Sequence, residues 1–102
     1  MRRTALRPSR GTQWPPDVAR AIYARDGGEC VGPMLGMPGD CEGPAEKDHI
    51  RAGGMGMKSR STLDNGVLLC SNTHHPMKTR EGRKWRPALI SYVEWMAKVT
   101  RR

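Results

Sequence analysis

The stretch LCSNTHHPMKT, residues 69–79, contains the most informative pattern in this chain. It places two adjacent histidines, His74 and His75, shortly after Cys70. Neighbouring residues on a helix or a strand point their side chains in very different directions. Two adjacent histidines therefore seldom bind one metal ion together, and this pair predicts two separate roles.

Outward from this stretch, the residues predict the order strand, loop, strand and helix. EKDHI at residues 46–50 is a candidate short strand, and GVLLC at residues 66–70 is a continuous apolar run of strand length. Between them, residues 51–64 are basic and rich in glycine, which is typical of a loop. The helix is predicted to start after Thr73, a candidate N-cap, and to end before Gly82.

Two further helices are predicted on either side of this unit. The first starts at Pro15 and Pro16, which suit a first helical turn, and stops at Gly27. The last starts after Pro87 and runs to about residue 100 with one apolar face. We expect the three tryptophans to pack in the core or against helices rather than on nucleic-acid bases: Trp14, Trp85 and Trp95.

The composition indicates one small domain. The chain has 102 residues, of which 36% are hydrophobic, it contains no Phe, and its mean hydropathy is −0.70. Such a chain buries a small core and often needs a disulfide or a metal ion for stability. Residues 1–13 are expected to form a flexible basic arm, followed by a single domain over residues 14–102.

The charge predicts a polyanionic partner. The formal net charge is +8 and the pI is about 10.1. Nucleic acid, and DNA in particular, is the simplest such partner, because neutralisation of phosphates dominates its binding to proteins. The alternative is that the cations only form a solvated surface. The residues expected to contact phosphates are Arg51, Lys58, Arg60, Lys78, Arg80, Arg83 and Lys84.

The cysteines predict a metal site rather than disulfides. Cys30, Cys41 and Cys70 are odd in number, so any disulfide scheme leaves one thiol unpaired. No signal peptide or membrane span is recognisable, so we expect a cytoplasmic protein with reduced thiols. Three cysteines and one histidine would complete a set of four ligands. The alternative is that the cysteines are small buried apolar residues.

Taken together, the motifs in residues 14 to about 80 resemble the HNH endonuclease family, whose ββα-metal fold consists of two strands and a helix. The segments that carry the resemblance are Asp48-His49-Ile50, Asn65, Leu69-Cys70, His74-His75 and Lys78-Thr79. The resemblance implies a small α+β fold with a ββα core at about residues 45–82. This core would be stabilised by a zinc site and flanked by N- and C-terminal helices.

The resemblance also implies two metal sites. A structural Zn²⁺ would be bound as a Cys₃His tetrahedron by Cys30, Cys41, Cys70 and His74. A catalytic divalent cation, which could be Mg²⁺, Mn²⁺, Ni²⁺ or Zn²⁺, would be bound by Asp48 and His75.

Two spacings depart from the family pattern. Three residues separate Cys70 from His74, where two are usual. An alignment without a gap would put Thr73 in the zinc position and make His74 the catalytic histidine. Ten residues lie between Cys30 and Cys41, where two are usual. We expect this segment, within the loop at residues 31–45, to be a looped insertion whose ends still meet, because the cost of closing a loop grows slowly with its length.

The chemistry of phosphodiester cleavage indicates roles for the remaining residues. His49, neutral near pH 7, can accept a proton from the attacking water, and the cation can stabilise the 3′-oxygen leaving group. Asp48 and His49 point to opposite faces of a strand, so they can serve one site only where the strand ends or twists. Asn65 is expected to tie the loop between the strands and to hold His49 in line; a plain turn residue and a metal ligand are the alternatives.

The predicted function is therefore a metal-dependent DNA endonuclease with weak site preference in a bacterial cell or a phage-infected host. Some small phage proteins of the HNH family assist the terminase in DNA packaging, so a phage terminase or another packaging protein is a candidate partner. A bacterial restriction-like or homing role is the alternative. A non-catalytic zinc module that binds nucleic acid is the first alternative. A degenerate HNH domain that serves as an interaction scaffold is the second.

Overall fold

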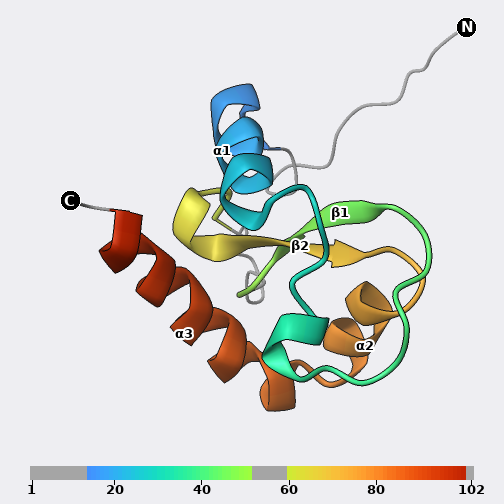
Figure 1. Ribbon diagram of the computed structural model, residues 1–102. Coiled ribbons are helices and arrows are strands. Elements are labelled where there is room, and N and C mark those ends of the chain that lie inside the picture. Colours follow the sequence, from blue (N-terminus) through green and yellow to red (C-terminus); the bar gives the residue numbers. More distant parts are fainter. Residues whose placement is uncertain (1–13, 52–59, 101–102) are drawn as a thin grey trace, which may run out of the picture.

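The structure, a computed structural model, describes residues 14–51 and 60–100 (Figure 1). This part of the chain forms a small α+β fold with three α-helices, two strands and two short 3-10 helices. In chain order the elements are α1 (Pro16–Asp26), η1 (Pro33–Leu35), β1 (Ala45–His49), η2 (Leu63–Asn65), β2 (Gly66–Cys70), α2 (His74–Arg80) and α3 (Gly82–Thr100). The predicted basic arm at residues 1–13 lies outside the described residues, and so does Lys58.

The first helix begins and ends where the sequence predicted. Pro16 occupies the first turn of α1, where its missing N–H costs nothing. Gly27 ends the helix in the left-handed conformation, with φ of 69°, which residues other than glycine rarely adopt. The backbone N–H groups after the helix bond to the carbonyls of Tyr23 and Ala24.

β1 and β2 form a two-stranded antiparallel sheet. All five residues of β2 are buried, as expected for the apolar run GVLLC, whereas Asp48 is the buried residue of β1. Asp48 pairs with Val67 and His49 pairs with Gly66 in the register. Because side chains alternate along a strand, Glu46 and Asp48 lie on one face of β1, and Lys47 and His49 lie on the other.

The helices pack on different sides of this hairpin. In Figure 1, α1 lies on one side of the two strands and α2 lies on the other, while α3 runs beside both η2 and α2. The core between β2 and α3 includes residues from the segment predicted as a loop, notably Val31 and Met37. That segment also contains η1, so it is more ordered than its glycines and prolines suggested.

The last helix starts earlier than predicted. α3 begins at Gly82 rather than after Pro87, and Pro87 lies inside it. The helix is initiated at Glu81, whose carbonyl accepts the N–H groups of Lys84 and Trp85. Pro87 is the sixth residue of α3, past the first turn, so its missing N–H costs the helix the bond that position 87 would make to the carbonyl of Arg83. Among the described helices, including this 19-residue one, none is long and apolar enough to cross a membrane.

Candidate metal centre and candidate active site

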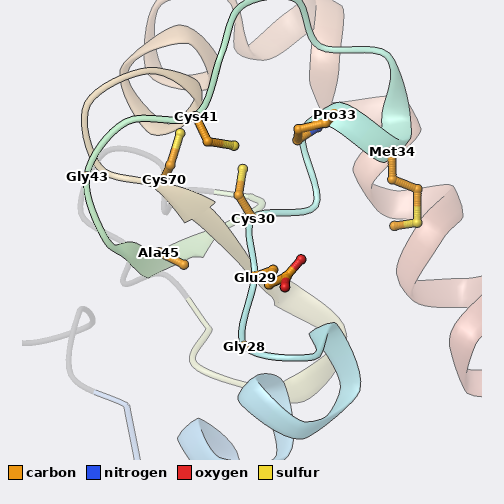
Figure 2. Close-up of a pocket in the computed structure, with 9 residues that line it drawn as sticks. All are labelled: Gly28, Glu29, Cys30, Pro33, Met34, Cys41, Gly43, Ala45 and Cys70. Atoms are coloured by element: carbon orange, nitrogen blue, oxygen red, sulfur yellow. The ribbon is translucent and has the colours of Figure 1, made fainter.

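Three cysteines and one histidine converge from four parts of the chain. Cys30 follows α1, Cys41 precedes β1, Cys70 ends β2 and His74 begins α2. Their ligand atoms all lie within 4.8 Å of one another. His74 Nδ1 is 3.2 Å from the sulfur of Cys70, 3.4 Å from that of Cys30 and 3.5 Å from that of Cys41. Figure 2 shows the side chains of Cys30, Cys41 and Cys70 close to one another, each from a different segment of the chain.

This cluster fits a tetrahedral zinc ion. Zn–S bonds of about 2.3 Å and a Zn–N bond of about 2.0 Å place nitrogen and sulfur ligands about 3.5 Å apart. His74 Nε2 lies 3.0 Å from the carbonyl oxygen of Pro38 and donates its hydrogen there, which leaves the Nδ1 lone pair directed at the sulfurs. Backbone N–H groups of Gly32 and His74 donate to the sulfurs of Cys30 and Cys70, respectively. The four residues could therefore hold a metal ion such as zinc.

The long spacing between Cys30 and Cys41 contributes to this centre. The intervening residues supply the Pro38 carbonyl that orients His74. They also include Gly32, where an added Cβ would lie 2.8 Å from the imidazole Cγ of His74. The structure places His74, rather than Thr73, in the cluster with the three cysteines.

The three thiols differ in acidity. Burial alone would raise the pKa of Cys70, but backbone N–H groups, above all that of His74, lower it to about 6. Burial raises the pKa of Cys30, and it raises that of Cys41 to about 12. Cys41 is an exposed residue overall, yet its sulfur lies within 4.8 Å of the other two. A metal ion that bound here would therefore displace protons from the cluster.

A second cluster forms where β1 faces α2. Asp48 Oδ1 lies 3.0 Å from Nε2 of His75, and a carboxylate oxygen of Glu46 contacts Nδ1 of the same ring. The structure thus brings together Asp48 and His75, the predicted ligands of the catalytic cation. Glu46 was missed in the sequence, although its position two residues before Asp48 on a strand could have indicated it.

Lys78 belongs to this cluster rather than to the surface. The sequence grouped it with the phosphate-contacting cations, but it is 6% exposed, so this prediction is corrected. Its ammonium lies 3.1 Å from Asp48 Oδ2 and donates a 2.6 Å hydrogen bond to the His49 carbonyl. Asp48 Oδ2 itself is buried and accepts no hydrogen bond of good geometry from the described residues. Lys78 lies three residues after His75, which places both on one side of α2.

His49 lies at the end of β1, on the opposite face from Asp48. Its ring stacks on Trp14, with 4.2 Å between ring centroids and 17° between planes. Its Nε2 lies 2.9 Å from the hydroxyl of Ser61. Among the described residues, no hydrogen bond or ion pair joins the ring to Asp48 or His75.

The His49 ring is neutral at pH 7. Burial lowers the pKa of His49 and the nearby Lys78 cation lowers it further, against an opposing effect of Asp48. A neutral imidazole keeps one nitrogen able to accept a proton.

Asn65 closes the segment between the two strands. Its Oδ1 accepts the N–H of Arg51 at 2.9 Å, and its Nδ2 donates to the carbonyls of Arg51 and Arg60 at 3.1 and 2.8 Å. The amide therefore ties together the two residues that bracket positions 52–59. This is the loop-tying geometry that the sequence predicted for Asn65.

The other predicted phosphate contacts that the structure describes are at the surface. Arg51 and Arg60 stand at the two ends of the segment that Asn65 closes. The exposed members of the set are Arg51, Arg60, Arg80, Arg83 and Lys84.

Comparison with protein-family models, curated proteins and solved structures finds no match to this chain. The function proposed below therefore depends on the residues and on their geometry.

Proposed function

We propose that this protein is a metal-dependent DNA endonuclease of the HNH type that hydrolyses phosphodiester bonds. The observation that carries the proposal is the meeting of Asp48 and His75, 3.0 Å apart, beside a Cys₃His cluster. The order β1, β2 and α2 supports a ββα core at the predicted position. His49, the next residue after Asp48, stands at the end of β1, as the predicted role requires.

Asp48 and His75 are suited to a divalent cation. Their facing atoms are separated by about the distance between neighbouring ligands of an octahedral cation with bonds of about 2.1 Å. Lys78 pairs with Oδ2 of Asp48, which leaves Oδ1 as the oxygen that faces His75, and Glu46 fixes His75 from its other nitrogen. When bound, a cation such as Mg²⁺ or Mn²⁺ would stabilise negative charge on the leaving 3′ oxygen.

His49 is assigned as the general base. It is a neutral imidazole at the end of a strand, and it can accept a proton from the attacking water. The scissile phosphate would have to lie across the end of β1, because Asp48 and His49 approach from opposite faces.

The surface charge supports DNA as the substrate. Arg51 and Arg60 are exposed close to His49, and the net charge of +8 favours a phosphate backbone. So small a domain offers little surface to read base edges, so weak sequence preference is expected. Action in the cytoplasm stays a prediction from the sequence, and a partnership with a phage terminase or another packaging protein stays a prediction from the resemblance.

Cleavage of supercoiled plasmid in the presence of Mg²⁺, Mn²⁺ or Ni²⁺ tests the proposal. We expect nicked or linear product from the wild-type protein and its loss in His49→Ala, with zinc content and helical circular dichroism unchanged. Ser91→Ala, at an exposed position of α3, is the matched control and should cut normally. Full activity of His49→Ala would remove His49 from the mechanism.

A non-catalytic zinc module that binds nucleic acid is the second candidate. The Cys₃His cluster and the net charge of +8 favour it equally. It predicts that the wild-type protein retards DNA in a gel and cuts it with none of these cations. A degenerate HNH scaffold predicts neither cleavage nor DNA binding.

A further inference from the structure

Ser61 is held in place beside His49 by the backbone on both sides. The carbonyl of Arg60, the preceding residue, accepts a 2.8 Å hydrogen bond from the Asn65 side chain. The carbonyl of Thr62, the following residue, accepts a 3.0 Å hydrogen bond from the Asn65 backbone N–H. Asn65 therefore fixes the position from which the Ser61 hydroxyl reaches His49 Nε2 at 2.9 Å.

A neutral imidazole carries its hydrogen on one nitrogen and its lone pair on the other. If Ser61 accepts a hydrogen bond from Nε2–H, the lone pair lies on Nδ1. Nδ1 of His49 has no hydrogen-bond partner within residues 14–51 and 60–100. In the opposite tautomer Nε2 would accept the hydrogen of the Ser61 hydroxyl, and the hydrogen on Nδ1 would have no acceptor among residues 14–51 and 60–100.

Trp14 fixes the plane of the same ring. The indole stacks on His49 and also covers Gly66, which pairs with His49 in the sheet. A Cβ at Gly66 would lie 2.6 Å from the indole of Trp14 and 2.6 Å from Ile22. Gly66 thus leaves the space that the indole occupies, and its φ of −135° is one that any residue can adopt.

We propose that Ser61 and Trp14 are positioning residues that hold His49 as the Nε2–H tautomer, so that Nδ1 is the nitrogen that accepts the proton from water. The catalytic part of this inference rests on the proposed function, whereas the tautomer does not. In many enzymes the histidine that acts as general base is oriented by a hydrogen bond from its second ring nitrogen to another residue.

Nuclear magnetic resonance tests the tautomer directly. The chain has three histidines, so His49→Gln identifies the His49 signals in long-range ¹H–¹⁵N spectra of the zinc-loaded, ¹⁵N-labelled protein. At about pH 8, where the ring is neutral, we expect a protonated Nε2 and an unprotonated Nδ1. Ser61→Ala should give a mixture of both tautomers, Ser61→Thr should restore the wild-type pattern, and Ser91→Ala should not change it. A protonated Nδ1 in the wild type, or an unchanged pattern in Ser61→Ala, would overturn the inference.

Cleavage kinetics supply the second readout. Ser61→Ala should lower kcat about 10- to 100-fold, the range typical of residues that orient a site ligand, with KM unchanged. Ser61→Thr should recover kcat, and Trp14→Phe should lose less activity than Trp14→Leu. If the wild type cuts no DNA, the proposed function fails while the spectra still decide the tautomer. If His49→Ala is inactive and Ser61→Ala is fully active, only the present inference fails.

Discussion

The ammonium of Lys78 lies 3.1 Å from Asp48 Oδ2, and the two side chains are only 7% and 8% exposed. The same ammonium donates to the carbonyl of His49. One cation from α2 therefore holds both the carboxylate and the backbone at the end of β1. Asp48 keeps its other oxygen, Oδ1, beside His75. This pairing explains why a lysine that looked like a surface residue in the sequence is buried.

Breaking this pair should destabilise the protein strongly. Lys78→Met leaves the buried Asp48 carboxylate without its partner, so we expect the free energy of unfolding to fall by about 3 kcal/mol. Urea denaturation of the zinc-loaded protein measures this change in the free energy of unfolding. Lys84→Met, at an exposed site, is the control and should stay within about 0.5 kcal/mol of wild type. The double variant with Asp48→Asn should lose less than the sum of the two single losses. Strict additivity would contradict a direct interaction.

The two adjacent histidines should separate in their effects on zinc. His74→Ala removes a ligand of the Cys₃His cluster, and we expect loss of zinc together with a lower free energy of unfolding. His75→Ala, the matched control one residue away, should retain about one zinc per chain, since it lies outside this four-ligand set. Elemental analysis and circular dichroism check both variants. Retention of zinc by His74→Ala with loss in His75→Ala would reverse the assignment of the two residues.

Zinc affinity should rise with pH. The pKa values of Cys30 and Cys41 are raised, to about 12 for Cys41, so both thiols are protonated at neutral pH in the metal-free fold. Cys70, whose pKa is lowered to about 6, is already ionised there. Binding then releases two thiol protons, so affinity should increase about 100-fold per pH unit near neutrality and more steeply below about pH 6. Competition with a chromophoric chelator from pH 5.5 to 8 measures the slope, and a flat profile would contradict thiolate ligation.

Gly66→Ala should displace Trp14. The added Cβ would lie 2.6 Å from both Trp14 and Ile22, and overpacking of this kind costs about 1–3 kcal/mol. We expect lower stability in urea and a changed tryptophan fluorescence spectrum as the indole leaves His49. Gly82→Ala is the control, because its Cβ would meet only the flexible end of Arg86. Equal stability of the two variants would show that the indole does not occupy this space.

Much of the fold was predictable because local signals agreed. The prolines and Gly27 bounded α1, and the apolar run at residues 66–70 marked β2. The start of α3 was not predictable in this way. Pro87 is a strong local signal against a helix, but its single missing hydrogen bond is outweighed by the packing of α3 on the core.

The sequence by itself determined which residue types were available for a metal site: three cysteines, three histidines and a carboxylate next to His49. Those types could be read because metal chemistry restricts ligands to a few side chains at recognisable spacings. Only the tertiary structure decided that Glu46 contacts His75, that Lys78 is buried on Asp48, and that Ser61 and Trp14 border His49. Such contacts join residues far apart in the chain, and their partners depend on how strands and helices pack, which no local pattern encodes.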